Sequence, residues 1–424
     1  MKIRHLRAVP LSLSIVGLLV LSSALFRRDA LQDAATLQPI PEVALRPPMT
    51  YVLMAPVSNV LDTVTLLSVR QHVTLLCTLI VGYLAWWWLF GRKTLPEVPP
   101  RRRAWREIAR VGVGIVALLA LYAAVAILPR PMAALETQLD ILVLDFHAHT
   151  RFSHDGRPDW TPEDVRTWHR NAGFHAAFVT DHRTFEGARD GWANNPNRAG
   201  EGTSLLPAIE AVWRGEHVNV LDADRFYRGL LTPSLRDVDD QSLTLASAVP
   251  GNEPVMIETL PGDLSKMVPA RGTGTAGVRA IEIIDGAPRG LGQTRRERAR
   301  IVHLADSLNL TLVAGSDHHG WGRTASGWTL LALPRWREVP PEQLTAAISK
   351  SIRLGGRNLT RVAERYVANT ETGIALPLTV PLVGWGMLRT LTTDERVVWI
   401  VWLVALYLLW RTREGWSKPR DAST

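Results

Sequence analysis

The stretch LDFHAHTRFSHDG, residues 144–156, decides which fold the chain is expected to adopt. It begins in an apolar strand, where the side chains of His147 and His149 lie two residues apart and point to the same face. Asp155 follows in a loop that closes with Gly156. Because imidazole and carboxylate groups are common ligands of divalent cations, the stretch predicts a metal site at the end of this strand.

Other apolar strands end in residues of the same kinds: Asp181, His182, Glu210, Asp317, His318 and His319, while His217 begins a further strand. Taken singly, Asp181 could cap a helix, Glu210 could be a surface carboxylate and His217 could be a hydrogen-bonded core residue. In a parallel barrel, however, the C-terminal ends of the strands converge on one face, where active sites form. So many ionisable groups are costly to leave unpaired, and divalent cations with ligands at about 2.0–2.2 Å would pair them.

Strands alternate with helices through the middle of the chain, which argues for a parallel α/β arrangement. Helices are predicted over residues 162–171, where Thr161 is the expected N-cap, and over 295–308 and 341–351. Strands are predicted over residues 141–145, 176–180, 205–210, 217–221, 255–258, 279–284 and 311–314.

Long apolar runs lie near both ends of the chain and predict membrane helices around a soluble domain. The predicted regions are an N-terminal membrane region over 1–138, a soluble domain over 139–365 and a C-terminal membrane region with a basic tail over 366–424. The N-terminal region holds helices at about 8–26, 72–90 and 111–128, and the C-terminal region holds apolar runs at 373–388 and 397–410. The first run is either a retained anchor or a cleaved secretory signal, and residues 29–50 are expected to be a linker.

The net charge of +8 is concentrated in Arg-rich stretches beside the apolar runs, such as residues 91–110. Membrane topology explains these stretches better than nucleic-acid binding, and no nucleic-acid partner is expected. The positive-inside rule places them in the cytoplasm and the soluble domain outside it, at a bacterial inner membrane. If both C-terminal runs span the bilayer, the basic tail falls on the wrong side, so their number stays open. The single cysteine, Cys77, excludes an intrachain disulfide and a cysteine-based zinc site.

The motifs DFHAHTRFSHDG, VTDH, AIE with His217, IEIIDG and GSDHH follow one another in the order of the PHP family, the polymerase and histidinol-phosphatase domain. Residues 139–330 closely resemble this family. The resemblance implies a distorted (β/α)7 TIM-like barrel, flanked here by transmembrane helices, and two or three divalent metal ions, with Mn, Zn and Fe all suited to nitrogen and oxygen ligands.

Carried over by position, the resemblance assigns the ligands of each ion. The first ion would be held by His147, His149, Glu210 and Asp317; the second by Glu210 as a bridge and His217; the third by Asp155, His182 and His319. The chain departs from the family at the second ion, because Leu260 stands before Pro261 where a histidine is usual. Either Glu258 substitutes or that ion is weakly bound or absent. Glu282, in IEIIDG, matches an acidic residue that is common in the family.

The resemblance implies a membrane-anchored phosphoesterase in which a metal-bound hydroxide attacks a small-molecule phosphoester. Asp317 is the candidate for moving the proton of the attacking water, and His318 or His182 for protonating the leaving oxygen. Arg183 and Arg323 are candidates for contacting a phosphate. Two alternatives stay open: hydrolysis of a C–N or C–O bond at the same site, and a catalytically idle, membrane-tethered ligand sensor.

Overall fold

Seven strands form where the sequence predicts them, and all belong to one ten-stranded sheet. The computed structural model describes residues 2–90, 100–127, 130–221, 231, 235–322 and 324–417. The predicted strands are β4 (Ile141–Ala148), β5 (Ala176–Val179), β6 (Ser204–Trp213), β7 (Glu216–Leu221), β8 (Val255–Glu258), β9 (Val278–Asp285) and β10 (Thr311–Gly315). Three further strands extend the sheet beyond β4, in the order β11, β12 and β1.

The sheet curls until the chain after β10 meets β4. The Asp317 N–H donates to the His147 carbonyl at 2.8 Å, and the His149 N–H donates to the His318 carbonyl at 3.2 Å. Large apolar side chains fill the inside of the curl, among them Phe146 and Phe178, whose rings stack 5.3 Å apart. The curl brings the ends of β4 and β10 together, and both strands carry predicted metal ligands.

The sheet is mixed, so the expected parallel arrangement is present only in part. Strands β4, β5 and β6 are parallel, as are β8, β9 and β10, but β7 is antiparallel to both of its neighbours. The reason is a two-residue turn at Arg214 and Gly215, which have φ angles of 53° and 86°. Positive φ at both central residues is typical of the tight turn that joins antiparallel strands. On the other side of the sheet, β11 (Gly327–Ala332) is antiparallel to β4 and β12 (Thr360–Arg365).

Two of the helices predicted in the middle region, over 162–171 and 295–308, begin directly after residues that cap them. In α6 (Pro162–Ala172), Thr161 and Asp164 cap each other reciprocally, and Gly173 ends the helix with a φ of 88°. Thr294 and Glu297 form the same capping box at the start of α10 (Arg295–Leu308). The other helices of this region are α7 (Glu186–Ala193), α9 (Asp240–Ser247) and α11 (Pro341–Leu354).

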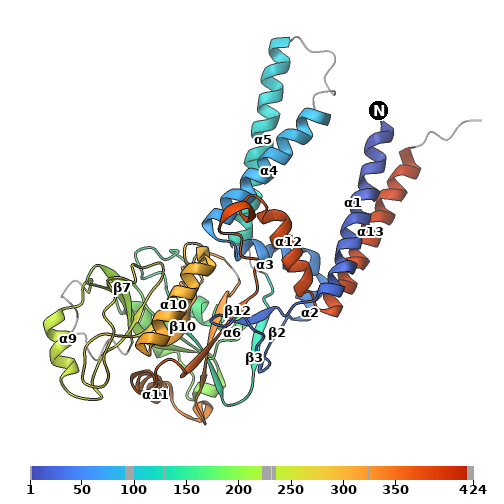
Figure 1. The fold of residues 1–424 in the computed structure, drawn as a ribbon. Helices are drawn as coiled ribbons and strands as arrows, with labels where there is room; N and C mark the ends of the chain where they lie inside the picture. Colours follow the sequence, from blue (N-terminus) through green and yellow to red (C-terminus); the bar gives the residue numbers. More distant parts are fainter. Residues whose placement is uncertain are drawn as a thin grey trace, which may run out of the picture.

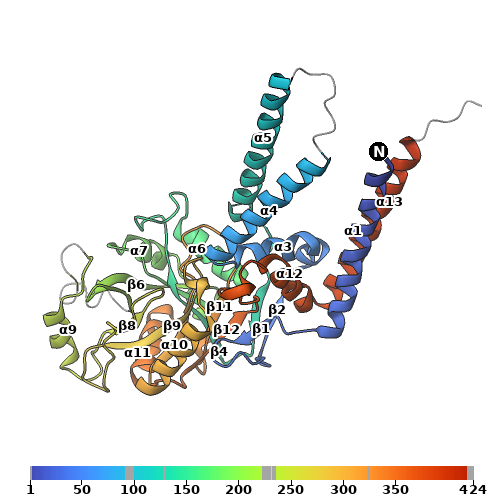
Figure 2. The ribbon, with the colours of Figure 1, turned by 45° about the horizontal axis from the view of Figure 1, so that its top comes forward.

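Two pairs of long helices project from the same side of the sheet (Figures 1 and 2). In one pair α1 (Lys2–Ser23) lies along α13 (Thr393–Ser417), and in the other α4 (Val69–Phe90) lies beside α5 (Pro100–Ile127). The shorter helices α2 (Met49–Leu53), α3 (Ala55–Thr65) and α12 (Thr379–Thr390) lie at the base of the two pairs. Within the described ranges, only α4 and α5 are both long and apolar enough to cross a membrane by length and composition; a shorter apolar stretch, Pro10–Phe26, covers the second half of α1 and the turn after it.

The stretch 29–50, expected to be a linker, is part of the folded structure. It contains β1 (Leu31–Asp33), which pairs with β12, and β2 (Val43–Arg46), which pairs with β3 (Ala134–Thr137). The linker expectation was wrong because a polar, Pro-rich composition does not reveal a short edge strand whose partner lies at the other end of the chain.

Candidate metal centre

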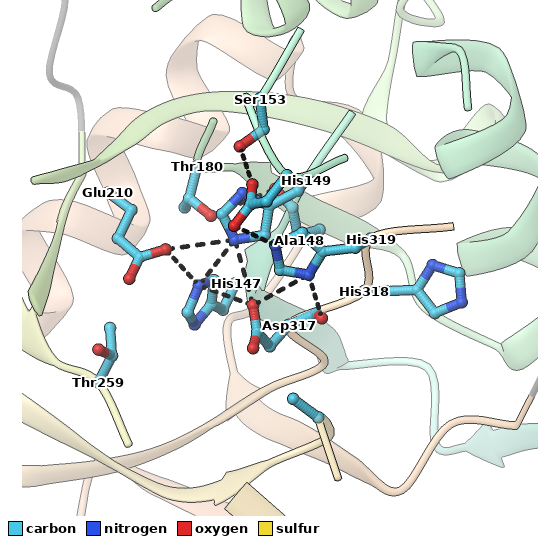
Figure 3. A network of polar contacts seen from close by, with 12 residues as sticks. His147, Ala148, His149, Ser153, Thr180, Glu210, Thr259, Asp317, His318 and His319 are labelled. Carbon is cyan, nitrogen blue, oxygen red and sulfur yellow. Dashed lines mark hydrogen bonds and ion pairs between the residues drawn. The ribbon is translucent and has the colours of Figure 1, made fainter. Parts of the chain in front are cut away.

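Four side chains from three separate parts of the chain bring one ligand atom each to a single point. His147 and His149 come from the end of β4, Glu210 from β6 and Asp317 from the residues after β10 (Figure 3). Both imidazoles point to the same side, as expected for alternate residues of a strand. The predicted convergence of His149, Glu210 and Asp317 is therefore present in the structure.

The distances between these atoms fit a shared cation. His147 Nε2 lies 3.0 Å from His149 Nε2, 2.9 Å from Glu210 Oε2 and 3.3 Å from Asp317 Oδ1. His149 Nε2 lies 3.2 Å from each of the same two carboxylate oxygens. Four ligands placed tetrahedrally about 2.1 Å from a metal ion are roughly 3.4 Å apart, so these atoms occupy nearly the required positions.

Hydrogen bonds behind the ligands hold them in this orientation. Glu282 is fully buried, and its Oε1 lies 3.0 Å from His147 Nδ1. A carboxylate on this nitrogen leaves Nε2 directed at the cluster, an arrangement common behind metal-bound histidines. Asp145, which the sequence reasoning left without a role, accepts the backbone N–H groups of His147 and Ser316, at 3.1 and 2.9 Å, and so ties β4 to the end of β10.

A second group of ligand atoms adjoins the first on its more exposed side. Asp155 Oδ2 lies 3.5 Å from His182 Nε2 and 3.2 Å from His319 Nε2. His319 Nε2 is buried and, apart from this ion pair with Asp155, makes no hydrogen bond within the described structure. Buried nitrogens without a hydrogen-bond partner are costly, and coordination of a cation would satisfy them.

The ligands predicted for the second ion are present only in part. His217 Nδ1 lies 2.6 Å from Glu210 Oε1, and the two form a third possible ligand group with His182. Glu258 does not replace the histidine that is absent before Pro261. In the pairing of β7 with β8, Glu258 lies opposite Val218. Asn219 is on the other face of the sheet, inside the curl, where its side-chain amide contacts Glu282. Glu258 therefore points away from the inside of the curl. Thr259, the next residue, lies on the side of the cluster (Figure 3).

Acids and bases in the cluster stabilise one another's charged forms. Burial by itself lowers the pKa of His149, but its hydrogen bonds with Asp317 and Glu210 raise it to about 9. Burial by itself raises the pKa of Glu210, but His147 and the neighbouring histidines hold it well below its usual range. Carboxylates thus remain ionised and imidazoles hold protons, which a divalent cation would replace on binding.

His318 lies outside the cluster, and this placement contradicts its predicted role as a proton donor. Its ring points away from the neighbouring His319 (Figure 3). Its Nδ1 accepts the Gly320 N–H at 3.2 Å, its Nε2 lies 3.1 Å from the Gly322 carbonyl, and the ring stacks on Trp168. With both nitrogens bonded to the backbone and the ring buried, His318 is a structural residue.

The two arginines predicted to contact phosphate gain no support from the described residues. Arg183 has an exposed side chain and a positive φ of 62°. Arg323 lies outside the described residues. Asp181, by contrast, has a clear structural role: its carboxylate accepts the backbone N–H and the hydroxyl of Thr150, both at 2.6 Å. This bond fixes the start of the loop that carries Asp155.

No protein-family model and no curated protein matches the chain. Among solved structures, PsfC from Pseudomonas syringae is 15% identical with a TM-score of 0.36, over 58% of this chain and 97% of its own. A two-domain protein from Bacteroides vulgatus that contains a predicted PHP-like metal-dependent phosphoesterase is 17% identical with a TM-score of 0.33, over 54% of this chain and 66% of its own. The lesion-specific endonuclease EndoQ from Pyrococcus furiosus is 13% identical with a TM-score of 0.37, over 54% and 60%. Likenesses at this level assign no function to the chain.

Proposed function

We propose that the chain is a membrane-anchored, metal-dependent hydrolase of the PHP type and that it cleaves phosphoesters. One observation carries the proposal: five distances of 2.9–3.3 Å join two imidazole nitrogens and two carboxylate oxygens around one point. Such a donor set suits a hard or borderline divalent cation, and neighbouring groups offer places for further ions.

Each ligand has a definite place in this proposal. The first cation would be held by His147, His149, Glu210 and Asp317, the third by Asp155, His182 and His319, and the second, more weakly, by Glu210 and His217. Bound cations would supply a water of lowered pKa and positive charge opposite the phosphoryl oxygens.

The chain's own residues would orient the reaction and move protons. Glu282 fixes the ring of His147, and Asp145 fixes the backbone of both ligand-bearing segments. The Asp317 side chain is 18% exposed, against 0% for His149, so it borders the open face of the cluster. We assign proton uptake to its second carboxylate oxygen, because Oδ1 faces the histidines.

The membrane part of the proposal rests on the arrangement of the long helices. The start of α1, the end of α4, the start of α5 and the end of α13 all lie at the end away from the sheet (Figure 1). In the sequence each of these ends adjoins basic residues, and the positive-inside rule would place all of them in the cytoplasm. Helix α12 has only 12 residues, about 18 Å of helix, and cannot cross roughly 30 Å of hydrocarbon. Helix α13 has 25 residues, about 38 Å of helix, although its apolar run, residues 397–410, is shorter than those of α4 and α5. We take it as the single C-terminal span, which would leave the basic tail on the cytoplasmic side and the catalytic domain outside.

The activity test uses full-length protein, purified in detergent and loaded with Mn²⁺, with an aryl phosphate as substrate. We expect His149→Ala and Asp317→Asn to lower kcat/KM by roughly 100-fold or more, because each removes a ligand of the first cation. His303→Ala, an exposed histidine on α10, is the matched control and should keep wild-type turnover. Full activity in both cluster variants would refute the proposal.

A substrate panel then decides the reaction. Amides and lactones test the alternative of C–N or C–O hydrolysis, because metal-activated water also attacks carbonyl groups. One similar structure is a lesion-specific endonuclease, so the comparisons do not support the expectation that nucleic acid is excluded, and duplex DNA belongs in the panel. Turnover of an amide or lactone with none of any phosphoester would move the assignment away from a phosphoesterase.

A further inference from the structure

A second polar site lies outside the candidate metal centre, in a cavity of about 200 Å³. The cavity lies between the end of β9, the loop before α10, the segment after β12 and the base of α3 and α4. None of the ligands assigned to the cations lines it. Asp285 forms its wall towards the barrel, next to Glu282 and His147, so the cavity lies behind the metal centre and not at its open face.

Four side-chain atoms that line this cavity make no hydrogen bond within the described structure: Asp285 Oδ2, Gln293 Nε2, Ser326 Oγ and Glu371 Oε2. Three of these residues are almost fully buried, with 1% of Asp285, 3% of Glu371 and 7% of Ser326 exposed. Two of them are held in place by their other oxygen. Asp285 Oδ1 accepts the Ala287 N–H at 2.7 Å, and Glu371 Oε1 accepts the Ser68 hydroxyl.

Buried polar groups without a partner are rare, since each costs about 1–3 kcal/mol. Four around one cavity therefore point to an occupant that satisfies them. A single water needs roughly 10–15 Å³ of such space, so about 200 Å³ has room for a ligand of many atoms.

The kinds of unpaired atoms define the ligand. The two carboxyl oxygens can accept hydrogen bonds, the Gln293 amide nitrogen can donate one, and the Ser326 hydroxyl can do either. A metal ion would satisfy the carboxyl oxygens but not the amide, and an anion would be repelled by the Glu371 carboxylate. Of the four arginines that line the cavity, Arg298 pairs with Glu364, Arg365 pairs with Asp62 and Arg28 donates to Gln32, while Arg295 has an exposed side chain.

A hydroxyl group both donates and accepts, so a molecule with several hydroxyls can satisfy all four atoms. Apolar side chains on the same walls, such as Ile284, Leu291 and Val367, suit the C–H faces of such a molecule. We propose that this cavity binds a small neutral polyol of roughly the size of a monosaccharide or a cyclitol. The inference does not depend on the proposed hydrolase activity.

Calorimetric titration of the full-length protein with glucose, myo-inositol and glycerol tests the proposal, in a detergent without a sugar head group. We expect at least one of the three to bind wild type. Ser326→Ala and Glu371→Gln should each weaken the Kd about five- to tenfold, which corresponds to the loss of one hydrogen bond.

Ser349→Ala is the matched control, because its buried hydroxyl is also unpaired but lies on α11 and does not line the cavity. Asp317→Asn should bind the polyol as wild type does, which separates this site from the metal centre. Three results overturn the proposal: no polyol binds wild type at millimolar concentration, inorganic phosphate binds in place of the polyols, or Ser326→Ala and Ser349→Ala bind equally well.

Discussion

His318 and His319 are adjacent in the sequence but have opposite surroundings. His319 Nε2 lies 3.2 Å from Asp155 Oδ2, inside the ligand cluster. The His318 ring lies 4.2 Å from Trp168 and 5.0 Å from Trp160, measured between ring centroids, and both its nitrogens bond to the backbone. His319 can therefore bind a cation, whereas His318 stabilises the loop through its backbone hydrogen bonds and ring contacts.

Alanine substitutions at these two positions should separate the two roles. We expect His318→Ala to keep its bound metal and to lower the free energy of unfolding by about 2–3 kcal/mol, because it empties a packed site and leaves backbone groups unpaired. His319→Ala should lose metal with a smaller effect on the unfolding of the metal-free protein. Metal analysis and thermal unfolding of both variants measure this, and loss of metal in His318→Ala alone would reverse the assignment.

The residue pattern alone could not tell these histidines apart, and only the family resemblance assigned His319, but not His318, as a ligand. The motif GSDHH predicts that the group is near a metal, but which side chain faces it depends on the backbone at Asp317, whose φ is 45°. A positive φ at a non-glycine residue breaks the alternation of side chains that a strand would give. His147 lies in β4 and His149 follows it directly, so their common direction was predictable from alternation, although the strand pairing shifts register between Asp145 and Ala148.

Glu258 provides a test of the second ion that does not involve activity. Burial, followed by repulsion from Glu216 and Glu282, raises the pKa of Glu258 to about 8. Below pH 4.5 the carboxyl is protonated in both the folded and the unfolded chain. Between pH 4.5 and 8 the Glu258 carboxyl is ionised only in the unfolded chain. The free energy of unfolding therefore falls as the pH rises, by up to about 1.4 kcal/mol per pH unit.

Glu258→Gln should remove this penalty and leave the metal content unchanged. We expect the variant to match wild type near pH 5 and to be more stable by about 2–4 kcal/mol at pH 8. Glu342→Gln, at an exposed glutamate on α11, is the matched control for the substitution. Chemical unfolding of wild type and Glu258→Gln across this pH range measures the difference in stability. Loss of metal in Glu258→Gln would instead support a ligand role for Glu258.

At the scale of elements, a buried polar cluster around Asp62 joins the helices to the sheet. Asp62, on α3, accepts hydrogen bonds from Tyr51 at 2.9 Å and Arg365 of β12 at 2.8 Å, and it pairs with Arg130 at 3.4 Å. The Thr324 hydroxyl, in the loop that follows His319, donates to Asp62 at 2.9 Å. One carboxylate thus connects α3, the segment after α5, β12 and the loop beyond the metal ligands.

Asp62→Ala should destabilise the chain by about 3–5 kcal/mol, because it leaves two buried guanidinium groups without their partner. Asp306→Ala removes an exposed ion pair with Arg357 and should cost at most about 1 kcal/mol. Thermal unfolding of the two variants compares them directly. Equal stability of the two variants would mean that this cluster does not stabilise the packing of the helices on the sheet.

Elements with local signals were predictable from sequence, and elements held by distant partners were not. Helix α10 begins and ends where it was predicted, because Thr294 and Glu297 form a capping box. Strand β1 was missed because its three residues become a strand only by pairing with β12, from Leu31 opposite Arg365 to Asp33 opposite Ala363. Strand β11 carries no ligand and was missed as well.

At the scale of the whole molecule, the helix pairs predict a definite topology. Reporter enzymes fused after residue 368 and after residue 424 would place the two ends of the C-terminal region. We expect the first reporter to be active outside the cytoplasm and the second inside it, because α13 would cross the bilayer once. Reporters active on the same side would exclude a single C-terminal span.

Direct metal analysis of the purified full-length protein tests the central claim, that residues far apart in the sequence share divalent cations. After dialysis against metal-free buffer, wild type and His303→Ala should retain at least one Mn, Zn or Fe ion per chain. His149→Ala and Asp317→Asn should retain far less. Wild-type protein that binds no divalent metal, or cluster variants that bind as much as wild type, would contradict the account.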